Sequence, residues 1–201
     1  VIGDIIHSNP EYVGAPDESF TDTDYVTFKN AKAGRAPRVY IGANDGMLHA
    51  FNAISGQESW AYVPSMLIPK MKRLSGRPYA HTYFVDGSIT VRDAKASGDW
   101  RTVLVGSLGA GGRGLYALDV TKTWLPSETD TANQIIMWEE RAGNTPGDPE
   151  AGANPDIGYI FDATTITQLN DGKWYAVFGN GIGSDNGEAV LMMKELRTDW
   201  S

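Results

Sequence analysis

Three glycines between two apolar runs match the spacing of a nucleotide-binding loop. Gly109, Gly111 and Gly114 fit the pattern G-x-G-x-x-G, which in dinucleotide-binding proteins leads into a helix whose first turn meets the pyrophosphate. The residues that follow, LYALDVT, form a short strand-like run rather than a helix, and no Lys-Ser/Thr pair comes directly after the glycines. We therefore predict that these glycines form a hairpin turn, in which positive φ angles are needed.

Two groups of oxygen-bearing side chains have features of calcium ligands. Asp22 and Asp24 have the alternating spacing found in calcium loops, but a twelve-residue loop with its glycine and final glutamate cannot be aligned with them. The Ser184–Gly187 turn contains Asn-Gly between two apolar runs, which is typical of a β-hairpin. The sequence therefore predicts a solvated acidic loop at the aspartates and a hairpin turn at Ser184–Gly187.

The chain has three histidines and no cysteine, which restricts its chemistry. His7, His49 and His81 are too scattered for a helical zinc motif, and no serine has the context of a nucleophile elbow. His49 lies inside an apolar run and is expected to be packed in the core. Without cysteine there are no disulfides, thiolate metal sites or thiol nucleophiles. We predict no catalytic, cofactor-binding or metal-binding residue in this chain.

The composition is that of a globular chain with many turns. Of 201 residues, 41% are hydrophobic, 21% are charged, 23 are glycine and 10 are proline. The net charge of −8 repels phosphate backbones and argues against a nucleic-acid partner. The longest apolar run, Ala189–Met193, is far shorter than the roughly 20 residues of a membrane helix, so no membrane span is expected.

Apolar periodicity predicts an all-β chain. One short helix is predicted at Ser65–Leu74, interrupted by Pro69, and polar loops are predicted at Thr129–Asn133 and Gly143–Pro155. The predicted strands are Arg38–Gly42, Met47–Ala53, Thr82–Val85, Ser88–Asp93, Thr102–Gly106, Leu115–Val120, Ile135–Glu139, Trp174–Gly179 and Ala189–Lys194.

Three segments of the chain repeat one plan: an apolar strand that ends in glycine, a polar or glycine-rich turn, and a second apolar strand. The strand-ending glycines are Gly42, Gly106 and Gly179. Because consecutive residues of these strands are apolar, both faces of each sheet need a neighbour. Radially packed, four-stranded antiparallel blades of a β-propeller meet this requirement.

The length of the chain limits the number of blades. We predict a single domain, 1–201, with blade 1 at about 1–64, blade 2 at about 81–141 and a partial blade 3 at about 154–201. The fold class is thus a partial β-propeller of about two complete blades and part of a third. Since propellers close with roughly four to eight blades, the chain is predicted to be a fragment of a larger propeller.

One turn carries a recognisable blade motif. AFNAISGQESW, at Ala50–Trp60, resembles the repeat of quinoprotein-like propellers. In such blades the residues at Asn52 and Ser55 satisfy backbone donors of the turn, Gly56 permits the turn, and Trp60 packs between blades. A weaker copy, ALDVTKTW at Ala117–Trp124, keeps Asp119 and Thr121 with altered spacing.

Longer phrases, taken in their order along the chain, resemble the C-terminal propeller of PilY/PilC-type pilus tip proteins over nearly the whole sequence. The most specific are HTYFVDGS and GSLGAGGRGLYALDVT, which combine high glycine density with fixed neighbours. The matching stretches are Gly3–Gly14, Arg38–Ala53, Tyr62–Asp93, Trp100–Thr121 and Asp171–Leu191.

The resemblance implies a non-enzymatic binding and assembly module of a type IV pilus tip protein, supporting pilus biogenesis and surface adhesion. It implies minor pilins or other tip components, and a host or abiotic surface, as partners. It implies an extracytoplasmic location, at the cell surface or pilus tip after transit through the periplasm or outer membrane. No stretch here matches the family's acidic calcium loop, so any calcium of the parent protein is expected outside these residues.

Two alternatives remain open on the sequence. A quinoprotein-type dehydrogenase fragment is suggested by the blade motif, but the calcium ion, the quinone pocket and the aspartate base of such an enzyme cannot be assembled from this chain. A glycan-binding propeller is suggested by six Trp and nine Tyr, most of which lie in predicted strands, where packing explains them.

Overall fold

The computed structural model describes residues 2–122, 135–142 and 154–197, and it consists of three antiparallel sheets. Blade 1 has the order β1-β2-β3-β4, blade 2 the order β5-β6-β7-β8, and blade 3 the order β9-β10-β11. The strands are β1 (Glu11–Val13), β2 (Arg38–Gly42), β3 (Leu48–Asn52), β4 (Glu58–Tyr62), β5 (Ile89–Ala96), β6 (Asp99–Ser107), β7 (Gly114–Asp119), β8 (Ile136–Arg141), β9 (Thr165–Gln168), β10 (Trp174–Gly179) and β11 (Leu191–Glu195).

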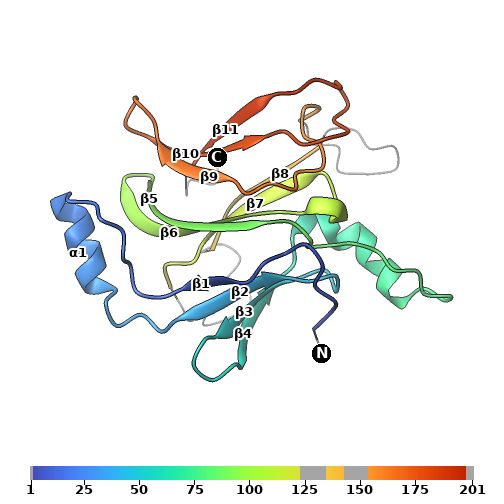
Figure 1. The fold of residues 1–201 in the computed structure, drawn as a ribbon, viewed down its shortest axis with the longest axis horizontal. Helices are drawn as coiled ribbons and strands as arrows, with labels where there is room; N and C mark the ends of the chain where they lie inside the picture. The colour runs from blue at the N-terminus through green and yellow to red at the C-terminus, as the bar shows by residue number, and fades with distance from the viewer. Residues whose placement is uncertain (1, 123–134, 143–153, 198–201) are drawn as a thin grey trace.

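The three blades are stacked face to face, with blade 2 in the middle (Figure 1). Their first strands are neighbours, because β1 contacts β5 and β5 contacts β9. The first strands of the three sheets therefore lie side by side. We call the side of the molecule formed by β1, β5 and β9 the inner edge. This arrangement is an arc of a β-propeller, as the sequence predicted.

Each face of blade 2 is covered by a separate apolar cluster. On β6, Val103 and Val105 belong to the cluster shared with blade 3, whereas Leu104 belongs to the cluster shared with blade 1. The same alternation continues on β7, where Ala117 faces blade 3 and Tyr116 faces blade 1. Successive side chains of a strand point to opposite faces, so the run of consecutive apolar residues is explained by two buried faces.

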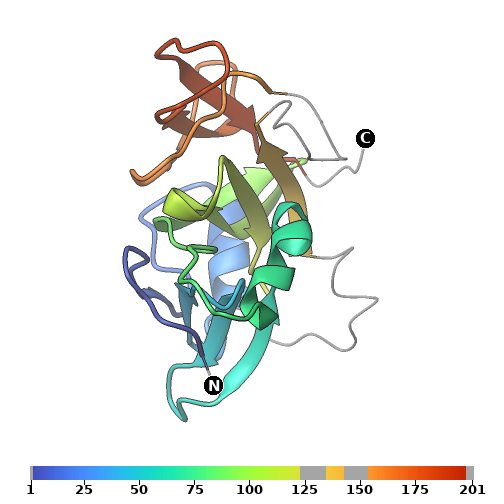
Figure 2. The same cartoon turned by 90° about the vertical axis from the view of Figure 1, so that its right-hand side faces the viewer.

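The predicted helix at Ser65–Leu74 is present as a 3₁₀-helix, η1 (Ser65–Ser75), with Pro69 inside it. Proline lacks the N–H that an interior position of an α-helix requires, so Pro69 opposes a regular α-helix here. Leu67 is the buried anchor of η1. Figure 2 shows η1 beside β8, and the backbone N–H of Ser65 donates to Glu139 Oε1 at 2.8 Å.

A second helix, α1 (Thr23–Ala31), was not predicted, so the expectation of a single helix was wrong. Its sequence, TDYVTFKNA, has no apolar stripe, and only Tyr25 is buried. Tertiary packing stabilises α1: the Tyr25 ring lies 4.7 Å from that of Trp100 and 5.1 Å from that of Phe20.

Some strand predictions were also wrong. Thr82–Val85 forms no strand; instead the Phe84 N–H donates to the Asn44 side chain at 2.9 Å, and the Val85 N–H donates to the Ala43 carbonyl at 3.3 Å. The short strands β1, β4 and β9 were not among the predicted ones. The other predicted strands lie within a few residues of their observed bounds. Thr129–Asn133 and most of Gly143–Pro155 lie outside the described residues.

Candidate functional site

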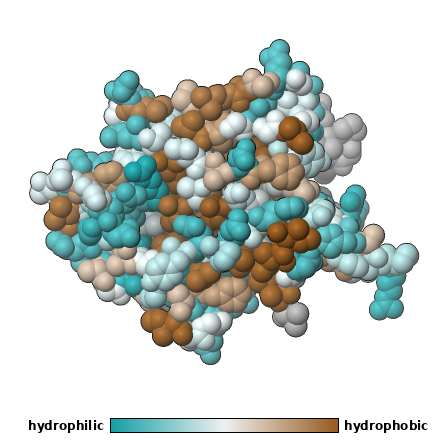
Figure 3. Space-filling view, viewed as in Figure 1, coloured by the Kyte–Doolittle hydropathy of each residue, from teal (hydrophilic) through white to brown (hydrophobic). Residues whose placement is uncertain are grey.

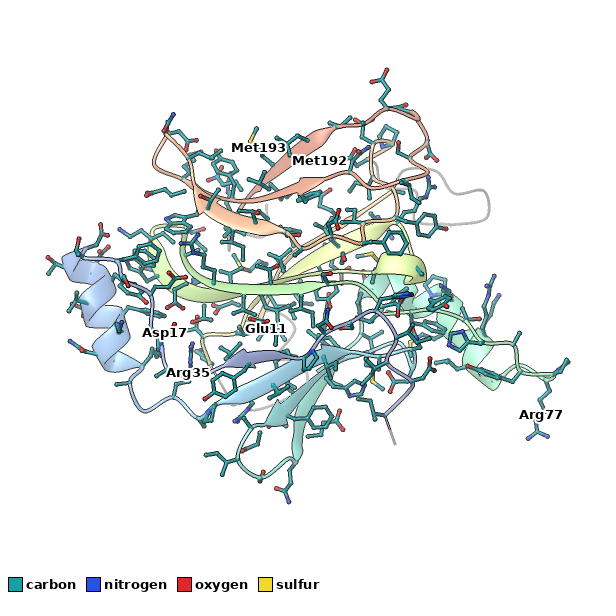
Figure 4. All side chains as sticks on the ribbon, viewed as in Figure 1. Glu11, Asp17, Arg35, Arg77, Met192 and Met193 are labelled. Atoms are coloured by element: carbon teal, nitrogen blue, oxygen red, sulfur yellow. The ribbon has the colours of Figure 1, made fainter. Side chains whose placement is uncertain are left out.

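A cleft of about 470 Å³ opens at the inner edge between blades 1 and 2. It is lined by β1, the chain that follows β1, Arg35, β5 and Thr102. Figure 4 shows Glu11 on β1 and places Asp17 and Arg35 between β1 and α1. The charged residues that line the cleft are Glu11, Asp17, Glu18, Arg35, Arg92 and Asp93.

Arg35 holds the wall of the cleft together. Its Nε donates to the Gly14 carbonyl at 2.8 Å, and its Nη2 bonds to the same oxygen. Its Nη1 donates to the Thr102 hydroxyl of β6. Burial lowers the pKa of the Arg35 guanidinium below its ordinary value, and the nearby Asp93 carboxylate opposes this effect. Arg35 therefore ties the end of β1 to blade 2.

Asp93 is the acceptor at the base of the same cleft and is 4% exposed. It accepts hydrogen bonds from the Tyr25 hydroxyl of α1 at 2.8 Å and from the Thr102 hydroxyl at 2.6 Å. Burial and the Asp93 hydrogen bond raise the pKa of Tyr25 above its ordinary value, so the phenol stays protonated and donates. Because Tyr25 belongs to α1 while Asp93 and Thr102 belong to blade 2, the network acts as a clamp between α1 and blade 2.

The chain between β1 and β2 extends this clamp to blade 3. The Phe20 ring lies 5.1 Å from Trp100 of blade 2 and 5.6 Å from Trp174 of blade 3. The Arg92 guanidinium lies 5.6 Å from the Phe20 ring, and its Nε pairs with Glu18 at 3.0 Å. Residues 14–35, which belong to the first blade, thus fasten all three blades together.

The aspartates that were weighed as calcium ligands begin α1 rather than a loop. Asp22 is the residue before the helix, and the Asp24 carboxylate pairs with Lys95 at 2.6 Å and accepts from the Tyr25 N–H at 3.0 Å. The predicted acidic loop at this position was therefore wrong. Because a lysine already neutralises Asp24, this pair does not fit a calcium ion.

Each histidine pairs with a carboxylate in a different place. His7 Nδ1 lies 2.6 Å from Asp86 Oδ2, His49 Nδ1 lies 2.7 Å from Glu58 Oε1, and His81 Nε2 lies 2.8 Å from Asp4 Oδ2. His49 is 3% exposed, as its place in an apolar run predicted. Hydrogen bonds from His81 and Asn44 lower the pKa of Asp4. Within the described residues, no group of three or more His, Asp or Glu side chains is arranged to hold a metal ion.

The glycine loop at Gly109–Gly114 and the turn at Ser184–Gly187, whose sequences resemble ligand-binding motifs, both serve the fold. Gly109–Gly111 forms a short 3₁₀ turn that leads into strand β7 rather than into a helix. Gly109 has φ +54°, and a Cβ at Gly111 would overlap the Phe84 carbonyl, so the glycines serve the turn and its close packing. In the Ser184–Gly187 turn, the Gly187 N–H donates to the Ser184 carbonyl at 3.2 Å.

The blade motif stabilises its turn as its residue types suggested. Asn52 Oδ1 accepts from the N–H groups of Ile54 and Ser55 at 2.9 and 3.0 Å, and Gly56 has φ +71°. Trp60 packs against the cluster between blades 1 and 2. In the second copy, Asp119 Oδ1 accepts from the Thr121 N–H at 2.9 Å, while Trp124 lies outside the described residues.

Comparison with known proteins identifies this arc. The family model of the PilY1 beta-propeller domain matches residues 2–199. The chain belongs to the PilY1 β-propeller family. The crystal structure of the Pseudomonas aeruginosa PilY1 C-terminal domain has a TM-score of 0.69 and 40% identity, and the match covers 93% of this chain and 35% of that chain.

Curated PilY1 relatives match the chain over almost its full length. The type IV pilus biogenesis factor PilY1 of P. aeruginosa strain UCBPP-PA14 is 43% identical over 208 residues. A PilY1 homolog of Xylella fastidiosa is 39% identical over 206 residues. Both matches cover 98% of this chain but only 16% of the relative. The chain thus spans about one sixth of the length of these PilY1 relatives.

The outward faces of this arc differ from its interior. On blade 3, Leu191 and Met193 are 70% and 58% exposed, and Figure 3 shows brown side chains across the top of the molecule, over this blade. On blade 1, Tyr12 is 63% exposed. Among the described helices, none is both long and apolar enough to cross a bilayer.

The clamp of Tyr25, Arg35 and Asp93 was missed by sequence reasoning. These residues are separated by up to 68 positions along the chain, and each is an ordinary polar or aromatic residue in its local sequence. The signal that was present is the strand context of Asp93: it ends the predicted strand Ser88–Asp93, and a carboxylate in such a place needs partners when buried.

Proposed function

We propose that the chain is a non-enzymatic binding and assembly module of a type IV pilus tip protein, where it supports pilus biogenesis and surface adhesion. The observation that carries the proposal is the match of the PilY1 β-propeller family to residues 2–199, together with relatives named as pilus biogenesis factors. The three clamped blades form a rigid support, and surface loops on such a support are suited to binding.

We place this module outside the cytoplasm, at the pilus tip or cell surface, after passage through the periplasm or outer membrane. Its proposed partners are minor pilins or other tip components, and a host or abiotic surface. The net charge of −8 supports the choice of protein partners over nucleic acid. The proposal assigns no cofactor or metal to these residues and leaves calcium to other parts of the parent protein.

The enzyme and glycan alternatives have less support. No relative that we compared is named as a dehydrogenase, and the three histidines bind different carboxylates: His7 binds Asp86, His49 binds Asp45 and Glu58, and His81 binds Asp4. Trp100 and Trp174 are 9% and 4% exposed and pack between blades 2 and 3. Sugar-binding tryptophans must present an open face, so these two side chains are better explained by packing.

The experiment is a deletion of the parent gene in its bacterium, complemented with the wild-type gene or with a gene lacking residues 1–201. We expect the deletion and the truncated gene to abolish surface pili, counted by electron microscopy, and to reduce attachment to a surface. Normal piliation and attachment without these residues would refute the proposal. Attachment that falls while pilus number stays normal would restrict the role to adhesion.

A separate assay tests the enzyme alternative. The purified protein is incubated with an alcohol, pyrroloquinoline quinone, calcium and a redox dye. We expect no dye reduction above that of a control without protein. Dye reduction that depends on the protein would favour a dehydrogenase and contradict the non-enzymatic assignment.

A further inference from the structure

A groove of about 440 Å³ lies on the far side of the molecule from α1, between η1, the glycine loop that joins β6 to β7, and the end of β8. Its described lining residues include five cations and no carboxylate. The cations are Lys70, Lys72, Arg73, Arg113 and Arg141. In a chain whose net charge is −8, this concentration of positive charge makes the groove a local site of anion attraction.

The floor of the groove is apolar. Leu67 and Leu108 are 2% and 1% exposed, and Met66 and Pro69 complete the apolar lining on the η1 side. Tyr159, which is 39% exposed, stands at the other side. A ligand that fits this lining must therefore carry both negative charge and apolar groups.

Lys70 is fixed at the base of the groove. Its Nζ donates to the carbonyls of Tyr83 and Gly111, both at 2.6 Å, and lies 5.0 Å from the centre of the Phe84 ring. Burial, with the nearby charge of Arg73, lowers the pKa of Lys70 to about 8. An anion bound in the groove would stabilise the charged form of this amine.

The chain itself shows which acceptors Arg113 binds. Its Nη1 pairs with the Asp185 carboxylate at 2.5 Å and donates to the Gly183 carbonyl at 3.0 Å. The contact is thus made to an acidic side chain and to peptide backbone of the same turn. A segment of another protein would offer the same two kinds of acceptor to the rest of the groove.

Two cations of the groove are available for new contacts. Lys72 and Arg73 are exposed, and neither forms an ion pair with any described residue. Beyond the end of η1, Arg77 points away from the body of the molecule (Figure 4) and continues the positive charge. Since unpaired surface cations attract anions over about a Debye length, this side of the groove is suited to capturing an acidic segment.

We propose that this groove binds an extended acidic segment of a partner protein, with carboxylates on Lys72 and Arg73 and an apolar side chain on the floor. The apolar lining favours a peptide with an apolar side chain over free phosphate, which has no apolar group to place against that lining. The groove has a single aromatic ring, Tyr159, which offers little stacking surface to an anionic polysaccharide. The proposal rests on the proposed function, because the partner is a protein that the module assembles with.

The test measures fluorescence anisotropy of a labelled glutamate-rich peptide with one central leucine, using the protein at its natural length. The control peptide has glutamine in place of every glutamate. We expect the acidic peptide to bind more tightly, and its affinity to fall about tenfold in the double variant Lys72→Glu/Arg73→Glu, because two attractions become repulsions. High salt should weaken the same binding.

A matched variant, Lys32→Glu, changes the charge at the end of α1, on the opposite side of the molecule. We expect it to bind the peptide as the wild type does. The proposal is refuted if both variants bind equally, or if the glutamine peptide binds as well as the acidic one. Tighter competition by inorganic phosphate or by heparin than by the unlabelled acidic peptide would also refute it, in favour of a phosphate or polysaccharide site.

Pilus counts separate this proposal from the proposed function. If the double variant loses peptide binding and the gene lacking residues 1–201 fails to restore pili, both proposals are supported. If removal of residues 1–201 abolishes pili but the double variant binds the peptide normally, the groove proposal fails and the proposed function stands. If that removal leaves piliation and attachment normal while the double variant loses peptide binding, the proposed function fails and the groove is a binding site without that role.

Discussion

Blades 2 and 3 have similar sequences but different surroundings. Every residue of β7 in blade 2 is buried, whereas β11 in blade 3 alternates between exposed and half-buried residues. The repeat in both blades nevertheless carries apolar residues at consecutive positions. Apolar residues at consecutive positions are expected in a blade that is covered on both faces. Blade 3 has this pattern, although among the described residues only blade 2 covers one of its faces.

The largest expected difference concerns two leucines. Leu104 is fully buried between blades 1 and 2, and Leu191 is 70% exposed on blade 3. In residues 1–201 expressed alone, Leu104→Ala should lower the free energy of unfolding by about 3 kcal/mol, because it leaves a cavity in a packed core. Leu191→Ala should change it by less than about 0.5 kcal/mol. Urea unfolding of both variants measures the difference, and equal losses would contradict the comparison.

The strand-ending glycines give the second difference. A Cβ at Gly106 would overlap the buried ring of Tyr116, whereas a Cβ at Gly179 would meet nothing within 4 Å. Gly106→Ala should therefore destabilise the chain by about 2 kcal/mol through overpacking, and Gly179→Ala should be close to neutral. Thermal unfolding of the two variants checks this. A neutral Gly106→Ala would mean that Tyr116 can shift, and that blade 2 is packed less tightly than the structure indicates.

Part of this contrast could be predicted from the sequence. The repeat predicted the blades, their antiparallel pairing and their mutual packing, because a two-sided apolar pattern in short strands has few other solutions. Helix α1 could not be predicted, since its stability comes from Tyr25 packing against Trp100 rather than from its own pattern. Thr82–Val85 was mistaken for a strand because Phe84 and Val85 are buried although their backbone joins no sheet.

The groove and the clamp at Asp93 differ in how far each could be recognised from the sequence. The cations Lys70, Lys72 and Arg73 are adjacent in sequence, so their charge could be noticed there. Arg113 and Arg141 join them only because Gly114 is the register partner of Arg141 in blade 2. Such a pairing depends on strand register, which a single sequence does not specify across a long connection. The clamp at Asp93 was hidden for the same reason.

Two tyrosine–aspartate pairs extend the comparison to polar contacts. Tyr25 donates to the buried Asp93 at 2.8 Å, and Tyr175 of blade 3 donates to the exposed Asp171 at 2.6 Å. Tyr25→Phe should cost about 1–2 kcal/mol, because it leaves a buried carboxylate short of a donor. Tyr175→Phe should have no measurable effect, since water replaces its hydroxyl. Chemical unfolding compares the pair, and a larger effect at Tyr175 would reverse the assignment of the clamp.

The Tyr25 contact also predicts a dependence on pH. The folded state raises the pKa of Tyr25 above the ordinary value of about 10, so its contribution is present below pH 10 and is lost as the pH rises further. The wild-type stability should therefore fall more steeply above pH 10 than that of Tyr25→Phe. Unfolding curves measured between pH 8 and about 11 test this sign. Parallel pH profiles would show that the phenol is not linked to folding.

The smallest effect comes from two adjacent methionines on β11. Met192 packs against the cluster between blades 2 and 3, whereas Met193 is 58% exposed (Figure 4). In residues 1–201 alone, Met192→Ala should cost about 1 kcal/mol, and Met193→Ala should cost less than about 0.3 kcal/mol.

The same methionine pair tests whether the outer face of blade 3 is covered by another blade or exposed. In a closed propeller the outer face of a blade is covered by the next blade, so in the full-length protein Met193→Ala should become as costly as Met192→Ala. The measurement is the unfolding of both variants in both lengths of protein. If Met193→Ala stays neutral in the full-length protein, the exposed face of blade 3 is a true surface, and its apolar side chains are available to a partner instead of to a neighbouring blade.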